Sequence, residues 1–131
     1  MNSHTRRSFD ELLEEVLERL PPLVHELIEK IPLVVEDYPS GSVLEQTGLR
    51  RRWQLCGLYT GIPLTERSVW QSGTLPDVVT IYREGILASA ADRDGNIETE
   101  RLRNEIRVTI LHELAHHHGL DEDELRELGY G

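Results

Sequence analysis

The sequence predicts an α+β fold, and we expect residues 1–131 to form a single domain. Three features predict this class: helical periodicity near the N-terminus, two short runs rich in β-branched residues, and a long stretch without glycine or proline near the C-terminus. A chain of 131 residues matches the usual size of one domain. Because 38% of the residues are hydrophobic, the chain buries a core without disulfide or metal cross-links, so any metal is expected to serve function.

Two helices are predicted at the start of the chain. Ser8 lies three residues before Glu11, the capping-box spacing, and this predicts a helix from residue 8 to residue 20. Its apolar positions recur at helical period and are Leu12, Leu13, Val16, Leu17 and Leu20. Because proline lacks an amide donor, Pro21 and Pro22 end this helix, and Pro22 can begin a second helix that reaches Lys30.

Two stretches are predicted as strands, with a long segment between them. Residues 33–35 form a β-branched-rich run bounded by prolines, and residues 78–87, "VVTIYREGIL", form the clearest strand. An edge of that second strand would pair with an extended peptide. Residues 40–77 contain five glycines and two prolines among apolar residues, so we expect them to be mostly irregular but packed.

A long helix is predicted near the C-terminus. Residues 91–96, "ADRDGN", indicate a turn, and the chain is predicted to be helical from about Ile97 until Gly119. Gly119 suits the left-handed residue that ends a helix. A last short helix is expected after it, with Asp121 as its N-cap.

The charge and the single cysteine exclude several classes of function. A formal net charge of −10 repels polyanions, so nucleic acids and anionic membrane surfaces are not expected as partners. The one basic run, Arg50 to Arg52, is a solvated surface or a site that recruits an acidic substrate. Cys56 is expected to be a small buried apolar residue rather than a nucleophile. No apolar run approaches the ~20 residues of a spanning helix, and the acidic start lacks the apolar core of a signal peptide, so we expect a cytoplasmic protein.

The pattern H-E-x-x-H at residues 112–116 indicates a metal site. Because residues four apart lie ~40° apart around a helix axis, the imidazoles of His112 and His116 can point at one ion, and neutral imidazole is a good zinc ligand. Glu113 lies ~60° from His116, where it reaches a metal-bound water as a general base. The alternative is a helix that uses polar histidines beside a groove without metal. His117 and His118 fall among apolar positions and are expected to pack rather than to bind.

The third ligand is expected from the acidic run after Gly119. A left-handed turn at Gly119 reverses the chain and brings "DEDE" back toward the histidines. Spacing favours Glu122 as the third ligand, with Asp123 as the alternative. Some of these acids are expected only to cap the last helix.

The stretch "TILHELAHHHGLDEDEL" resembles the signature of the small bacterial zincin-like metallopeptidases, H-E-x-x-H-x-x-G-x-x followed by an acid. "LPPLVHELIEKIPLVVEDYP", "GLYTGIPLTER" and "LPDVVTIYRE" are similar to other stretches of that family in the same order. The resemblance implies a compact zincin-like domain, with a small sheet packed against the active-site helix, and zinc bound by His112, His116 and an acidic residue. The family most often has aspartate where this chain has Glu122, which leaves Asp123 open as the ligand.

These observations lead to the hypothesis of a zinc-dependent peptidase acting on peptides or proteins, with Glu113 as base. Tyr59 and Tyr82 are candidates to stabilise the oxyanion, against a role in the core. Two alternatives are a metal-binding adaptor without peptidase activity and a hydrolase of non-peptide amides. Substrate specificity and oligomeric state are left open by the sequence.

Overall fold

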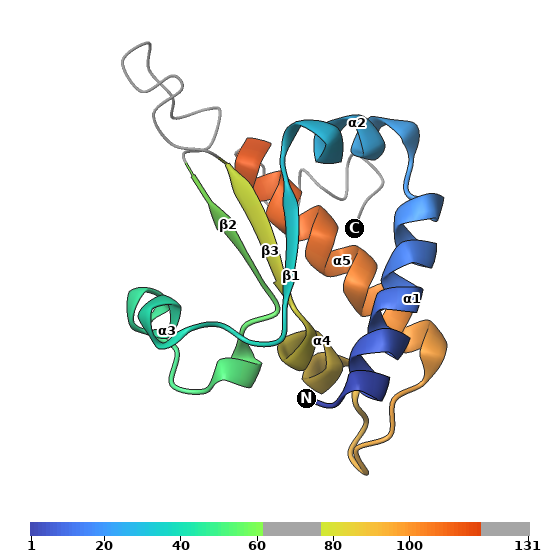
Figure 1. The fold of residues 1–131 in the computed structure, drawn as a ribbon, viewed down its shortest axis with the longest axis vertical. Helices are drawn as coiled ribbons and strands as arrows, with labels where there is room; N and C mark the ends of the chain where they lie inside the picture. Colours follow the sequence, from blue (N-terminus) through green and yellow to red (C-terminus); the bar gives the residue numbers. More distant parts are fainter. Residues whose placement is uncertain (62–76, 119–131) are drawn as a thin grey trace.

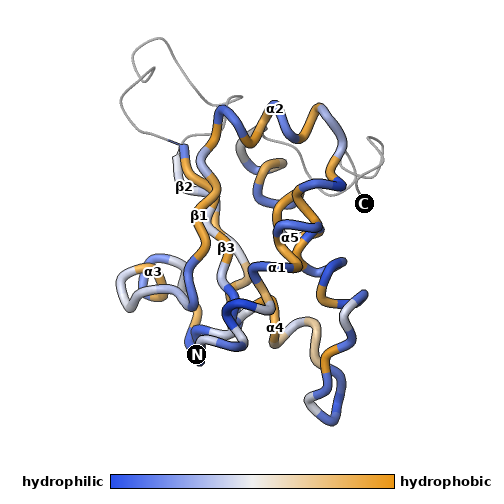
Figure 2. Tube along the Cα trace, turned by 45° about the vertical axis from the view of Figure 1, so that its right-hand side comes forward, coloured by the Kyte–Doolittle hydropathy of each residue, from blue (hydrophilic) through white to orange (hydrophobic). Residues whose placement is uncertain are grey.

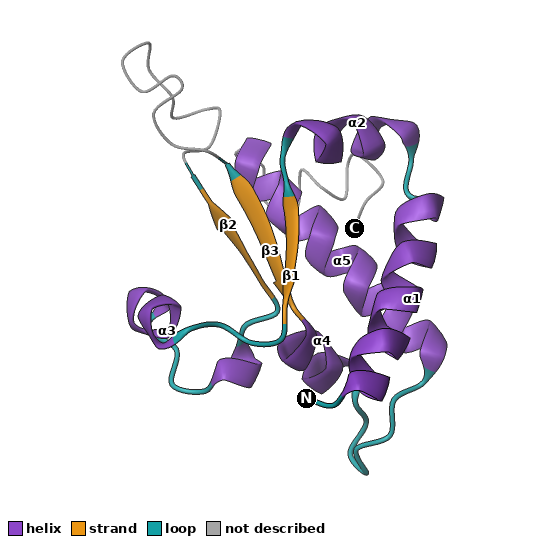
Figure 3. Ribbon diagram, in the orientation of Figure 1, coloured by secondary structure: helices purple, strands orange, loops and turns teal. Residues whose placement is uncertain are grey.

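A computed structural model describes residues 1–61 and 77–118, with only the backbone of residues 117 and 118. The described chain contains helices and a small sheet, which confirms the predicted α+β class (Figures 1 and 3). In chain order the elements are α1 (Ser3–Arg19), α2 (Pro22–Lys30), β1 (Leu33–Glu36), α3 (Gly41–Thr47), the 3-10 helix η1 (Arg52–Gln54), β2 (Gly57–Thr60), β3 (Val78–Tyr82), α4 (Arg83–Ala90) and α5 (Thr99–His118). No helix in these ranges is long and apolar enough to cross a membrane.

The sheet has three strands in the order β1-β3-β2. β1 pairs with β3 in parallel, and β2 pairs with β3 antiparallel. Because β3 lies in the centre, both of its edges are already paired, so the expectation that this strand offers an edge to a peptide is wrong. The strand also ends at Tyr82 rather than near residue 87, since residues 83–90 form α4 and bury Gly85, Ile86 and Ala90.

The helices α1, α2 and α5 lie on one side of the sheet, and α3 lies on the other (Figures 1 and 2). The core forms between α1, α4, α5 and the covered face of the sheet, to which alternate strand residues such as Val79 and Ile81 contribute. Its largest fully buried side chains are Phe9, Val24, Val79, Ile81, Ile86, Ile106 and Ile110. This core supports the inner face of α5 along most of its length.

The N-terminal helix begins earlier than predicted. Asn2 caps α1 by accepting a hydrogen bond from the amide of Thr5 (2.8 Å), so the capping-box spacing at Ser8 lies inside the helix. A polar side chain before a helical stretch is an equally good cap wherever it occurs, and the residues between Asn2 and Ser8 extend the helix without a break. The prolines act as predicted, since α1 ends at Arg19 and α2 begins at Pro22.

The segment after β1 is more regular than predicted. Residues 40–61 contain α3, η1 and β2, and α3 ends at Gly48 in the left-handed conformation (φ 74°). Residues 62–76 lie outside the described residues. The predicted turn at residues 91–96 is confirmed: the Asp92 carboxylate accepts from the amides of Asp94 and Asn96, and Gly95 has φ 83°.

A cluster of four charged residues joins α1, the end of β1 and the start of α4; we call Arg6, Asp10, Asp37 and Arg83 the Arg83 cluster. Arg83 donates through Nε to Asp10 and through Nη1 to Asp37, both at 2.9 Å. Arg6 donates to the other oxygen of Asp37 at 2.7 Å. These contacts hold the pKa of Asp37 down at about 2, mainly through the hydrogen bond from Arg6. The cluster therefore joins elements that are far apart in the sequence.

Candidate metal centre

The helix α5 carries the H-E-x-x-H residues as one continuous element, which confirms the predicted long helix. Its inner face is apolar and is formed by Leu102, Ile106, Ile110, Leu111, Leu114 and Ala115. Val108, on the same helix, is exposed. Two polar side chains on α5, Thr109 and Glu113, are buried where the helix meets the sheet.

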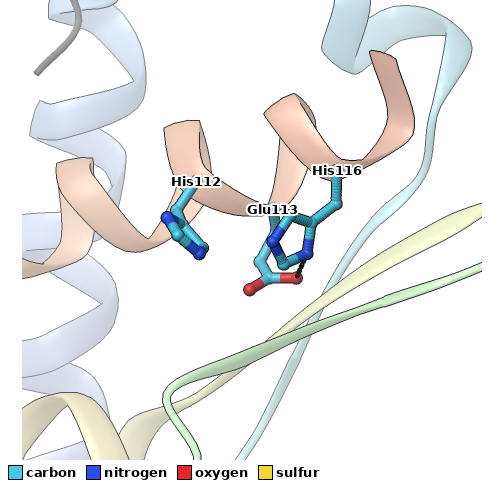
Figure 4. A group of neighbouring side chains, drawn as sticks. All are labelled: His112, Glu113 and His116. Carbon is cyan, nitrogen blue, oxygen red and sulfur yellow. Dashed lines mark ion pairs between the residues drawn. The ribbon is translucent and has the colours of Figure 1, made fainter. Parts of the chain in front are cut away.

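His112, Glu113 and His116 form one group, which we call the His–Glu–His group (Figure 4). One ligand atom from each residue can be chosen so that all three lie within 4.8 Å of one another. The two imidazole rings are 4.7 Å apart between centroids and inclined at 65°. The Nδ1 atom of His116 lies 3.3 Å from Oε2 of Glu113. The helical spacing thus brings both imidazoles and the carboxylate to one place, as the sequence indicated.

Burial differs sharply within the group. The side chain of Glu113 is 9% exposed, whereas that of His116 is 47% exposed. His112 is half-buried between these extremes. The imidazoles are therefore accessible from outside, while the carboxylate lies behind them against the sheet.

The environment of Glu113 disfavours its charged form. Burial raises the pKa of this carboxyl, and His112 and a hydrogen bond from the backbone of Tyr59 act in the opposite direction. Burial raises the pKa of the Tyr82 hydroxyl, and the negative charges of Glu36 and then Glu113 raise it further. A carboxyl that takes up a proton more readily than usual suits a group that must accept and release one.

Gly57 allows Glu113 to lie this close to β2. A Cβ atom on Gly57 would come within 2.9 Å of Cγ of Glu113 and of Cγ2 of Thr109. It would also come within 3.3 Å of the Thr80 carbonyl oxygen. Sequence reasoning missed this role, although a glycine inside the short apolar run "LCGLYT" is a signal of close approach by another segment.

The other residues singled out in the sequence are Tyr59, Tyr82 and Cys56. The Tyr59 hydroxyl donates to Asp77 (2.9 Å), and the side chain of Tyr82 is buried in the core. The Cys56 thiol lies half-buried, 3.2 Å from the Ser89 hydroxyl, and burial raises its pKa. This agrees with the predicted apolar role of Cys56, because a raised pKa leaves less of the reactive thiolate.

Several expectations fall on residues for which the structure gives no side-chain placement. Gly119, Asp121, Glu122 and Asp123 lie outside the described residues, so the left-handed turn, the last short helix and the third ligand stay predictions. The side chains of His117 and His118 are likewise outside the described part of the chain.

The donor set of the His–Glu–His group fits a zinc ion. Zinc prefers imidazole nitrogen and carboxylate oxygen at ~2.0–2.2 Å, and the two imidazoles come from one rigid helix. One helix supplies only part of a tetrahedral shell, which leaves room for a further protein ligand and for substrate. These features are those of a group that could hold a metal ion.

Comparison with known families agrees with the geometry. The family of zincin-like metallopeptidases matches residues 28–131, which include every strand and the whole of α5. The chain therefore belongs to this family. No curated protein matches the chain significantly.

Proposed function

We propose that the protein is a zinc-dependent peptidase that hydrolyses peptide bonds in peptide or protein substrates. The observation that carries this proposal is the His–Glu–His group, in which two accessible imidazoles stand in front of one buried carboxylate. Membership of the metallopeptidase family supports the same reaction class.

The three residues have distinct roles in this proposal. His112 and His116 hold the ion, and Glu122 or Asp123 completes the protein ligands. When bound, zinc supplies Lewis-acid activation of the scissile carbonyl and of the attacking water. Glu113 takes the proton of that water and delivers it to the leaving amine, so the same carboxyl acts first as base and then as acid.

The position of Glu113 favours a base over a ligand. Gly57 and the backbone of Tyr59 hold its carboxylate on the β2 side of α5. A side chain whose position is fixed by its neighbours in this way needs little conformational rearrangement before it accepts a proton. Both imidazoles, in contrast, reach the outer surface, where substrate and the remaining ligands arrive.

The test of the proposal is digestion of a peptide library by purified protein, with zinc content measured on the same sample. We expect one zinc per chain, cleavage that stops on chelation and returns with zinc, and neither zinc nor cleavage in His112→Ala. Bound zinc without cleavage of any peptide would contradict the proposal and favour a metal-binding adaptor. Cleavage of small amides but not of peptides would favour the other alternative.

The third ligand is tested by zinc affinity of two variants. Since the three-residue step from Gly119 reproduces the usual ligand spacing, Glu122→Ala is expected to lose more affinity than Asp123→Ala. A large loss in the aspartate variant alone would reverse the assignment.

A further inference from the structure

A basic and aromatic surface lies on the side of the sheet away from α1, α2 and α5. The helix α3 buries none of its residues, and neither does η1 (Figure 1). Five exposed side chains lie before α3, between the two helices and in η1, and we call them the Arg–Trp patch: Tyr38, Arg50, Arg51, Arg52 and Trp53.

The aromatic side chains of the patch are held open to solvent. Trp53 is 52% exposed and Tyr38 is 43% exposed. The Arg52 guanidinium lies 3.9 Å from the centre of the Tyr38 ring and donates to Glu84 of α4 at 2.8 Å. Arg52 and Tyr38 are therefore pre-arranged, which lowers the entropy lost when a partner binds.

Two positive charges of the patch are not neutralised. Arg50 and Arg51 form no ion pair with any residue in the described ranges, 1–61 and 77–118. They adjoin Arg52 and Trp53 in a chain whose formal net charge is −10. Tryptophan, tyrosine and arginine are the residues that most often dominate binding energy at interfaces. The patch therefore suits a ligand that carries carboxylates and offers apolar contact to Trp53.

The patch lies close to the metal centre along the chain. Trp53 precedes Gly57 by four residues, and four residues of extended chain span at most ~14 Å. Gly57 is the residue of β2 that contacts Glu113. A peptide held at the His–Glu–His group would therefore reach Trp53 by passing β2, which is an edge strand of the described sheet.

We propose that the Arg–Trp patch is a substrate-binding surface that selects peptides with acidic residues several positions away from the cleaved bond. This deepens the proposed peptidase function and rests on it. Acidic side chains of the substrate pair with Arg50 and Arg51, while an apolar side chain packs on Trp53.

The experiment measures binding separately from cleavage. Full-length, zinc-loaded Glu113→Gln protein is titrated with a labelled peptide that has glutamates on either side of a leucine, and with a matched peptide that has glutamines instead. We expect the glutamate peptide to bind about tenfold more tightly at low salt, and the difference to shrink as salt is added. A second variant, Trp70→Phe, leaves Trp53 as the only tryptophan, and its emission is expected to shift on binding.

The matched control removes the same charge elsewhere. In the Arg50→Ala/Arg51→Ala variant the preference for glutamate is expected to disappear, whereas Arg93→Ala/Arg101→Ala, at two exposed arginines outside the patch, retains it. In the active enzyme, the first variant is expected to raise KM for the glutamate peptide more than KM for the glutamine peptide.

Several outcomes would overturn the proposal. Equal binding of the two peptides, or equal loss in both arginine variants, shows that the patch does not select acidic substrates. Tight binding of a single-stranded oligonucleotide that depends on Arg50 and Arg51 would assign the patch to nucleic acid instead. Acidic peptides that bind at the patch but are never cleaved by the zinc-loaded wild type would contradict the peptidase function and the substrate role together, whereas cleavage without acidic preference contradicts only the patch.

Discussion

The Arg83 cluster and the His–Glu–His group both place an ionisable side chain in the interior, but they treat its charge in opposite ways. The Arg83 side chain is 11% exposed and is matched by two aspartates. The Glu113 side chain is 9% exposed, and no lysine or arginine in the described chain forms an ion pair with it. Accordingly the pKa of Asp37 is lowered, whereas the pKa of Glu113 is raised.

This difference in pKa is the one expected between a structural polar cluster and a functional one. Burying a charged side chain costs desolvation free energy, and its ion-pair partners offset that cost. Removing one partner leaves the cost uncompensated. A buried carboxyl without a matching cation has no such compensation, so stability alone would not favour it. We therefore expect substitutions in the first cluster to change folding and substitutions in the second to change chemistry.

The sharpest separation is expected from Glu113→Gln. Removal of the base should lower peptide hydrolysis by about 10²- to 10⁴-fold while zinc content and thermal stability stay the same or rise. Activity, bound zinc and melting temperature are measured on one preparation. His116→Ala is the control that should lose zinc, and comparable zinc loss in Glu113→Gln would make this glutamate a ligand.

The reciprocal change is Arg83→Met. Because it leaves Asp10 and Asp37 without their shared partner, we expect the free energy of unfolding to fall by about 2–4 kcal/mol, with zinc stoichiometry unchanged. Urea denaturation measures this loss. Arg93→Met, at an exposed position in the turn before α5, is the matched control and should change stability little. A neutral Arg83→Met would show that the cluster contributes nothing to folding.

Gly57→Ala is expected to lower both stability and hydrolysis, because the absence of a side chain at Gly57 allows Glu113 to lie against β2. The added methyl group meets Glu113 and Thr109, so stability should fall by about 1–3 kcal/mol and hydrolysis should fall further than stability explains. Gly41→Ala is the control, because a Cβ there meets nothing within 4 Å. If the two alanine variants behave alike, the close approach of β2 to α5 does not position Glu113.

The smallest effect is expected from pH. The pKa of Asp37 in the folded protein is about 2, below its ordinary value of 3.8, so its contribution to stability is complete above about pH 4 and is lost as pH falls toward 2. Wild type should therefore lose melting temperature more steeply than Asp37→Asn over this interval. Parallel curves for the two proteins would show that Asp37 does not contribute in this way.

The sequence by itself determined the features that depend on near neighbours along the chain. Proline placement set the border between α1 and α2, the β-branched runs predicted β1 and β3, and an uninterrupted helical stretch predicted α5. The spacing of His112 and His116 was enough to place both imidazoles together, because a helix has a fixed period. The sequence pattern did not predict the end of β3 at residue 82, because the strand-favouring residues "VVTIY" are followed by the helix α4 without a glycine or proline between them.

Only the tertiary structure decided which distant segments meet. The central position of β3 follows from a parallel pairing with β1, which depends on how the helices cover the sheet rather than on either strand alone. Glu113 is buried because Gly57, 56 residues earlier, brings β2 against α5, and Arg83 is matched by Asp10, 73 residues away. Contacts between residues so far apart are set by the packing of whole elements, which periodicity and spacing do not encode. For that reason the sequence indicated which residues are candidates to bind a metal, whereas the fold decided how deeply Glu113 is buried beside them.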